Sequence, residues 1–186
     1  MPKYGMVIDQ RRCVGCMACV LACKAENEVP PDQFRTRVVE NVEGTFPHLR
    51  MELRSELCNH CDNPPCVYNC PTRASYKDEK TGLVLLDKKR CVGCKACVAA
   101  CPYDARYIHH EKGFADKCTF CNHRLKEGKE PACVATCIGK SRIFGDMTDP
   151  KSPAASALRT AHAEVQLAGA GTEPRVYYIR KFGKPE

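Results

Sequence analysis

The chain has 186 residues, of which 16 are cysteine, seven tyrosine, six phenylalanine and none tryptophan, so a cysteine-defined scaffold of one or two small domains with a thin apolar core is expected. The longest stretch without an acidic or basic residue is Cys13–Cys23, which excludes a membrane-spanning helix because such a helix needs about 20 mostly apolar residues. The net charge of +7 comes with no Lys/Arg run longer than Lys88–Arg90, so nucleic-acid binding is disfavoured.

Short strands are predicted in the first two thirds of the chain. Alternating apolar and polar residues in Phe34–Val42 and His48–Leu57 flank Glu43-Gly44, and this pattern predicts a β-hairpin. Gly82–Asp87 and Arg106–His109 have the composition of two further short strands. These strands separate segments that are rich in cysteine.

The last part of the chain is predicted to hold one helix and one strand. Ser152–His162 is the expected helix, with Ser152 as its N-cap and Pro153 at its first position. Gly169–Pro174 is expected to form a loop, and Arg175–Lys181 has the pattern of a final strand.

The cysteines fall into four groups of four with none left over. Groups one and three both have the spacing C-x2-C-x2-C-x3-C, group two has C-x2-C-x4-C-x3-C, and group four has C-x2-C-x11-C-x3-C. In chain order the groups are Cys13, Cys16, Cys19 and Cys23; Cys58, Cys61, Cys66 and Cys70; Cys91, Cys94, Cys97 and Cys101; and Cys118, Cys121, Cys133 and Cys137.

Two segments around groups one and three repeat each other. Val7–Lys24 aligns with Leu85–Pro102, and eleven of the 18 aligned positions are identical. Groups two and four also correspond at their ends, where PPCVYNC (Pro64–Cys70) resembles EPACVATC (Glu130–Cys137). The chain is therefore interpreted as two copies of a small cysteine-bearing unit.

The spacing of groups one and three is that of the bacterial ferredoxin run, in which three cysteines bind one [4Fe–4S] cluster and the fourth binds the other cluster of a pair. Pro71 and Pro102, which follow groups two and three, complete that signature. Zinc is disfavoured because it typically uses two separated C-x2-C pairs, often with histidine. Disulfides are disfavoured because bridging within C-x2-C-x2-C is geometrically poor. Four [4Fe–4S] clusters would use all 16 thiols.

Four clusters also account for the excess of basic residues. An oxidised [4Fe–4S] cluster with four thiolates carries about −2, and such a centre dominates its local field. Four of them contribute about −8, which changes the formal charge of +7 to about −1. The excess Lys and Arg side chains are then counter-charges to the clusters, and no anionic partner is required.

Six stretches of the chain have the pattern of a known family. They are Cys13–Pro31, Cys58–Lys77, Cys91–Tyr107, Lys117–Cys137, Gly145–Pro153 and Pro174–Gly183. They resemble the four-cluster iron–sulfur (beta) subunits of membrane-bound molybdopterin oxidoreductases, with the closest likeness to the polysulfide/thiosulfate reductase type. Nitrite-reductase-associated, arsenate reductase and dimethyl sulfoxide reductase subunits are relatives. Ile138 departs from the pattern, because proline usually follows the fourth cysteine of a ferredoxin run.

The resemblance implies how the cysteines share four [4Fe–4S] clusters. Groups exchange ligands, so that three cysteines of one group join one cysteine of another. The implied sets are Cys13, Cys16, Cys19 and Cys137 for cluster 1; Cys23, Cys118, Cys121 and Cys133 for cluster 2; Cys58, Cys61, Cys66 and Cys101 for cluster 3; and Cys70, Cys91, Cys94 and Cys97 for cluster 4. Cluster 1 is expected to face a molybdenum subunit and cluster 4 a membrane quinone subunit.

The expected fold is α+β, with two bacterial-ferredoxin-like modules that contain little regular secondary structure. Module A comprises residues 1–33 and 102–146 and carries cysteine groups one and four. Module B comprises residues 58–101 and carries groups two and three. Residues 34–57 form a hairpin insertion, and residues 147–186 form a helix-and-strand tail expected to dock on a partner.

The expected function is electron transfer between a membrane quinone/quinol subunit and a molybdopterin catalytic subunit in a polysulfide/thiosulfate reductase-like complex. The alternative is a free soluble polyferredoxin that shuttles electrons by diffusion. No nucleophile–base pair or phosphate-binding loop is present, so no catalytic residue is expected in this chain. Met1–Gln10 lacks the apolar region of a signal peptide, so a peripheral subunit on the periplasmic side would be exported with a partner, and the cytoplasmic face is the alternative.

Three further residues lie beside the cysteines. His60 and His123 are interpreted as packing or surface groups rather than proton carriers. Lys95 lies inside group three and is interpreted either as a charge that raises the potential of cluster 4 or as a solvated side chain.

Overall fold

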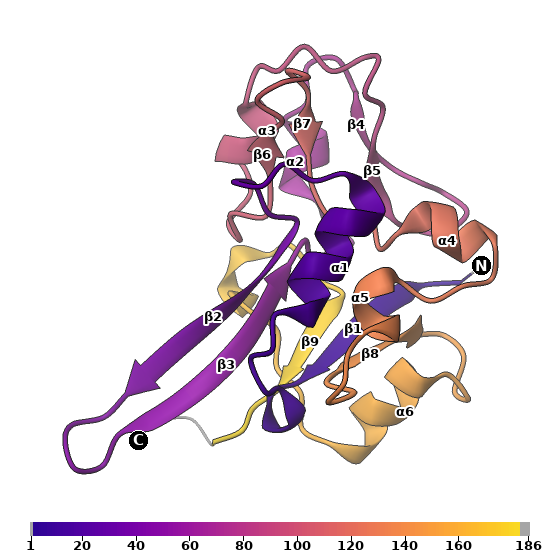
Figure 1. Cartoon of the computed structure of the whole chain (residues 1–186). Helices are drawn as coiled ribbons and strands as arrows, with labels where there is room; N and C mark the ends of the chain where they lie inside the picture. Colours follow the sequence, from indigo (N-terminus) through magenta and orange to yellow (C-terminus); the bar gives the residue numbers. More distant parts are fainter. Residues whose placement is uncertain (1, 183–186) are drawn as a thin grey trace.

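A three-stranded sheet organises one half of the protein in this computed structural model, which describes residues 2–182. Strand β1 (Tyr4–Asp9) lies between β8 (Arg142–Asp146) and β9 (Val176–Ile179), antiparallel to the first and parallel to the second. Five of the six residues of β1 are buried, as expected for a central strand. The sheet therefore joins the two ends of the chain with a segment that follows the last cysteine (Figure 1).

The helix and strand predicted near the end of the chain are confirmed. Helix α6 (Pro153–Thr160) packs on the sheet, and the Ser152 hydroxyl caps it by accepting a hydrogen bond from the backbone N–H of Ala155 at 3.2 Å. Strand β9 lies inside the predicted segment Arg175–Lys181. A short 3-10 helix, η2 (Ala168–Ala170), lies where the predicted loop begins.

The predicted hairpin is also confirmed. Strands β2 (Thr36–Glu43) and β3 (Arg50–Leu57) pair antiparallel over their whole length, from Thr36 opposite Leu57 to Glu43 opposite Arg50. Figure 1 shows the hairpin projecting from the body of the molecule, with helix α1 (Ala18–Asn27) beside its base.

The other half of the protein contains short elements around the second and third cysteine groups. The predicted strands Gly82–Asp87 and Arg106–His109 are confirmed at their centres, and each pairs with a neighbour to form a small hairpin. The elements are α2 (Pro65–Tyr68), β4 (Ser75–Lys77), β5 (Val84–Leu86), α3 (Ala96–Ala99), β6 (Tyr107–Ile108) and β7 (Ala115–Asp116).

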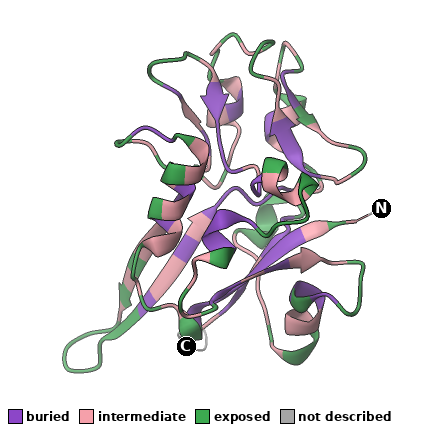
Figure 2. Cartoon of the chain, turned by 45° about the vertical axis from the view of Figure 1, so that its right-hand side comes forward, coloured by how far each residue is buried: buried purple, intermediate pink, exposed green. Residues whose placement is uncertain are grey.

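Three more short helices complete the chain: η1 (Gln10–Arg12), α4 (Asn122–Lys126) and α5 (Ala132–Ala135). The apolar core is thin and is interleaved with thiols, because eight of the sixteen free cysteines are buried. In Figure 2 the buried residues follow the strands of the sheet and the centre of the molecule, whereas most loops are exposed or intermediate. The α+β fold with two ferredoxin-like modules and little regular structure is confirmed.

The boundaries of the two modules remain a prediction. The structure does show where elements of the predicted tail, residues 147–186, pack. Because β9 pairs with β1 and α6 packs beside β8, the helix α6 and the strand β9 of the predicted tail belong to the central sheet and its cover. Among the residues described, no helix has both the length and the apolar character needed to cross a membrane.

Candidate metal centres

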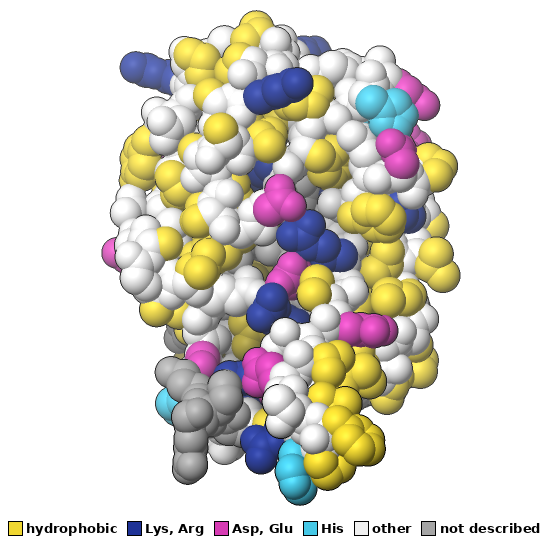
Figure 3. Space-filling model, turned by 90° about the vertical axis from the view of Figure 1, so that its left-hand side faces the viewer, with side chains coloured by type: hydrophobic (Ala, Val, Ile, Leu, Met, Phe, Trp, Pro, Cys, Tyr) yellow, Lys and Arg dark blue, Asp and Glu magenta, His cyan; other side chains and the backbone are white. Residues whose placement is uncertain are grey.

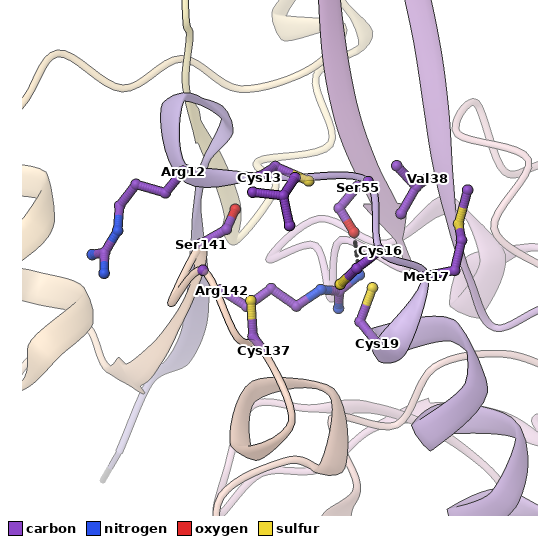
Figure 4. Close-up of a pocket in the computed structure, with 13 residues that line it drawn as sticks. Arg12, Cys13, Cys16, Met17, Cys19, Val38, Ser55, Cys137, Ser141 and Arg142 are labelled. Carbon is purple, nitrogen blue, oxygen red and sulfur yellow. Dashed lines mark hydrogen bonds between the residues drawn. The ribbon is translucent and has the colours of Figure 1, made fainter.

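A cavity lies where the loop before α1 meets the loop after α5. Its thiols come from Cys13, Cys16, Cys19 and Cys137. The loop turns tightly because Gly15 and Met17 both have left-handed backbone conformations, with φ of 68° and 58°. Figure 4 shows side chains from both loops and the guanidinium group of Arg142 around the same space. The structure thus brings together the four residues of the first predicted set.

A second cavity lies one turn further along the same face of α1. Its thiols come from Cys23, Cys118, Cys121 and Cys133, which are the second predicted set. Helix α1 carries both Cys19 and Cys23, one turn apart, so that each cavity receives one of them. The helix therefore holds the two cavities at a fixed, short separation.

The third predicted set gathers around Cys61. Burial raises the pKa of the Cys61 thiol to about 12, and the neighbouring thiols Cys58, Cys66 and Cys101 contribute in the same direction. Such mutual influence requires the four sulfurs to be near one another. Thiols held together in this way can ionise only with a strong positive partner, which an iron centre supplies.

The fourth predicted set lies in the half of the protein that contains α2 and α3. Cys97 is buried in an apolar cluster with Val84, and Cys91 packs against that cluster. Cys70 follows α2, which packs against α3, while Cys94 is exposed.

Backbone N–H groups point at several of these sulfurs. Cys70 accepts from the N–H of Ser75 at 3.3 Å, and Cys91 accepts from the N–H of Ala115 at 3.3 Å. Hydrogen bonds to thiolate sulfur stabilise its negative charge and are one means by which proteins adjust iron–sulfur potentials. Cavities lined by four thiols, together with amide donors, fit [4Fe–4S] clusters.

Two buried basic side chains near the sulfurs were not identified from the sequence. Arg142 lines both the first and the second cavity, and Arg106 acts electrostatically on the thiols of Cys66 and Cys58. A sequence signal exists for both, because each arginine follows the fourth cysteine of its group, Cys137 or Cys101, by five positions.

His60 and His123 occupy different environments. His60 is fully buried, stacks on Phe120 with 4.0 Å between ring centroids, and accepts a hydrogen bond at Nδ1 from the N–H of Val84. Burial lowers the pKa of His60 well below its usual value, so the ring is neutral. His123 is exposed and lies 2.7 Å from a carboxylate oxygen of Glu26. His60 is therefore a packing group and His123 a surface group, as the sequence predicts.

Comparison with known proteins agrees with the cysteine pattern. Two families, each described as a 4Fe-4S dicluster domain, match residues 49–147 and residues 12–74. Over 182 residues the chain is 48% identical to a tetrathionate reductase subunit of Salmonella typhimurium, and the match covers 95% of this chain and 72% of that protein. The chain belongs to the iron–sulfur subunits of the molybdopterin oxidoreductases.

Other relatives have related names. A tetrathionate reductase subunit of Archaeoglobus fulgidus is 46% identical, with 97% of this chain and 84% of that protein covered. The arsenate respiratory reductase iron–sulfur subunit of Shewanella sp. is 37% identical, with 97% of each chain covered. The subunit therefore carries four [4Fe–4S] clusters on its 16 cysteines and transfers electrons. The similarity to reductase subunits supports this role over that of a free polyferredoxin.

Proposed function

We propose that this subunit relays electrons between a membrane quinone/quinol subunit and a molybdopterin catalytic subunit that reduces a sulfur compound of the polysulfide, thiosulfate or tetrathionate class. The names of the tetrathionate reductase relatives support the substrate class. The observation that carries the relay is the sharing of α1 between two four-thiol cavities. With the clusters bound by Cys13, Cys16, Cys19 and Cys137 and by Cys23, Cys118, Cys121 and Cys133 held this close, no domain motion is needed for electrons to pass.

The ends of the proposed relay have matching exposed cysteines. Cys16 and Cys94 occupy equivalent positions in the internal repeat, and both are exposed. The loop before α1 and helix α3 lie toward opposite ends of the molecule in Figure 1. Cluster 1, near Cys16, is therefore the proposed contact with the molybdopterin subunit. Cluster 4, bound by Cys70, Cys91, Cys94 and Cys97, is the proposed contact with the quinone subunit.

Apolar side chains at the surface favour docking. Val14, which lines the first cavity, is 61% exposed, and Leu21 on α1 is 65% exposed. Phe46 at the tip of the hairpin is 88% exposed, and Leu49 and Met51 follow it at 55% and 50%. Figure 3 shows hydrophobic side chains gathered at the lower end of the face toward which the hairpin projects. Exposed apolar groups of this density are typical of protein interfaces.

The location of the subunit follows from its partners in this proposal. It binds peripherally to the membrane through the quinone subunit, and it reaches the periplasmic side together with a partner that carries the export signal. A subunit on the cytoplasmic face is the alternative, and fractionation of spheroplasts distinguishes the two.

Two measurements test the proposal. The holoprotein should contain ~16 iron atoms per chain, all in [4Fe–4S] form, as measured by iron analysis and EPR on an anaerobic sample. Capture of the subunit from detergent-solubilised membranes should also bring down molybdenum. About 12 irons would contradict the cluster count, and a monodisperse subunit without molybdenum would contradict the complex.

A further inference from the structure

Five Lys and Arg side chains are buried in the part of the chain that the structure describes: Arg35, Arg106, Lys117, Arg142 and Arg175. Two of them have carboxylate partners, since Arg35 pairs with Asp116 at 2.8 Å and Arg175 pairs with Asp62. Within residues 2–182, no carboxylate lies within ion-pair distance of the other three. Burying a charge without a counter-charge is costly, so these three cations need a negative group that no described carboxylate supplies.

Arg142 lies between the first and second cavities and lines both. Its Nη2 donates to Thr36 Oγ1 at 2.5 Å and to Ser55 Oγ, and the second of these bonds is the dashed line in Figure 4. Among the described residues, neither Nε nor Nη1 has a hydrogen-bond partner. Burial lowers the pKa of Arg142, but the pKa is raised overall because several neighbouring thiols, first among them Cys133 and Cys19, act in the opposite direction. One of these two thiols lines each cavity.

Lys117 lies between the second and third cysteine sets. Its Nζ donates to the carbonyl oxygen of Cys118, at 2.6 Å, and to that of Val84. Cys118 lines the second cavity. Val84 packs with both Cys66 of the third set and Cys97 of the fourth, and its N–H donates to Nδ1 of His60, which lies between Cys58 and Cys61 of the third set. Only 1% of Lys117 is exposed, so water does not screen its charge.

Arg106 lies between the third and fourth sets. Arg106 is only 4% exposed, and it follows Cys101 of the third set by five positions. On the side of the fourth set, Nη2 of Arg106 donates to Ser75 Oγ at 2.8 Å, and the N–H of Ser75 donates to Cys70 Sγ. The Nε of Arg106, like that of Arg142, lacks a partner in the described structure.

We propose that Arg142, Lys117 and Arg106 are positioning residues that occupy the three intervals between successive clusters, and that each one raises the reduction potentials of the two clusters beside it. A positive charge stabilises the more negative, reduced form of a nearby centre. A cation between two clusters also weakens the repulsion between them, so that adjacent clusters can both be reduced. This inference rests on the ligand sets of the proposed function.

The test is a potentiometric EPR titration of the holoprotein, with iron counted in every variant. Arg142→Gln should lower the potentials of clusters 1 and 2 only, and Lys117→Gln those of clusters 2 and 3. Arg106→Gln should lower the potentials of clusters 3 and 4. We expect the reduced-to-oxidised ratio of each affected cluster at a fixed potential to fall roughly tenfold, which is ~59 mV for a one-electron couple.

Charge-preserving variants provide the matched controls. Arg142→Lys, Lys117→Arg and Arg106→Lys should keep the original potentials, and Arg159→Gln on the exposed end of α6 should leave all four unchanged. If a glutamine variant loses its two flanking clusters while the charge-preserving variant keeps them, the role of the charge is supported.

Several results would overturn the proposal. One is a glutamine variant that binds all four clusters and whose reduction potentials do not change. Another is a glutamine variant in which the potential of only one cluster, or of all four, changes. A third is equal loss of clusters in the glutamine variant and the charge-preserving variant of the same residue. An original protein with fewer than four clusters would instead contradict the ligand sets, so the two failures are distinguishable.

Discussion

The two copies of the internal repeat hold the same cysteine run in different surroundings. In each copy a glycine with positive φ, Gly15 at 68° or Gly93 at 67°, turns the loop. In each copy the residue just before the helix is also left-handed, Met17 in the first and Lys95 in the second. The run C-x2-C-x2-C-x3-C therefore encodes its own local loop, independent of its surroundings.

The copies differ in the length of the helix that carries the third cysteine. Helix α1 continues for ten residues, whereas α3 has only four. Pro102 favours the short helix, because a proline disfavours helical conformation in the residue before it, and Lys24 stands at the equivalent position of the first copy. The Lys24 ammonium donates to three backbone carbonyl groups, of Pro30, Pro31 and Gln33. Helix α5 is equally short with Ile138 at the corresponding position, so proline favours the short form but is not required for it.

Replacing the fourth cysteine of either copy is expected to have the largest effect on iron content and stability. Cys101→Ser should remove the cluster bound mainly by Cys58, Cys61 and Cys66, and iron should fall to ~12 atoms per chain. Cys23→Ser should instead remove the cluster bound by Cys118, Cys121 and Cys133. Because metal binding supplies folding free energy in a domain with a thin core, both variants should also unfold more readily. Iron analysis and EPR of the remaining clusters measure the loss.

The predicted exchange of the fourth cysteine between groups would be wrong if each group bound its own cluster. Cys101→Ser would then remove the EPR signal of the cluster held by Cys91, Cys94 and Cys97, and the signal of the cluster near Cys58 would persist.

Introducing proline into the first copy, at the position equivalent to Pro102 of the second, should have the next largest effect on stability. Lys24→Pro places a proline inside α1, where it removes a helical hydrogen bond and clashes with the preceding turn, at a cost of about 3 kcal/mol. Lys24→Ala is the control, because it removes the three ammonium bonds but keeps the helix. The free energy of unfolding of the loaded protein measures both. Equal stability of the two variants would show that the length of α1 does not depend on this position.

Replacing each of the two loop glycines with alanine should distinguish the cost of backbone strain, which both sites share, from the cost of a steric clash at one of them. A non-glycine residue in the left-handed region costs about 1–2 kcal/mol, which applies to Gly15→Ala and Gly93→Ala alike. A Cβ at Gly93 would lie 2.4 Å from the carbonyl oxygen of Gly113, whereas a Cβ at Gly15 would meet only the flexible side chain of Leu53 at 3.2 Å. Gly93→Ala should therefore be the more destabilising in denaturant unfolding. A larger cost for Gly15→Ala would contradict this.

The smallest effect, on the reduction potentials, is expected from changing the charge of the exposed residue that precedes each helix. Lys95→Glu reverses a charge beside cluster 4, and Met17→Lys adds one beside cluster 1. Because both positions are exposed, screening reduces the effect, so shifts of about 20–40 mV are expected, downward for cluster 4 and upward for cluster 1. A potentiometric EPR titration measures each shift. If no cluster moves by more than about 10 mV, Lys95 is a solvated charge without influence on the relay.

Several elements could be predicted from local patterns. The hairpin was found because its strands alternate on both sides of Glu43-Gly44, and α6 because Ser152 and Pro153 mark its start. The strands β1 and β8 were not predicted. Their pairing joins Tyr4–Asp9 to Arg142–Asp146, and nothing in either short segment specifies a partner so distant in the sequence.

The cysteine groups and their spacing, which depend only on the sequence, determined the cofactor and the family of this subunit. A run such as C-x2-C-x2-C-x3-C specifies its own loop because the chemistry of the cluster requires sulfurs at short, fixed intervals. Only the tertiary structure decided that Arg142, Lys117 and Arg106 would lie among the thiols without a carboxylate partner in residues 2–182. A basic residue in a sequence is most often a solvated side chain, and burial is a property of the surrounding elements, so these cations could be recognised only after the strands and loops around them were assembled.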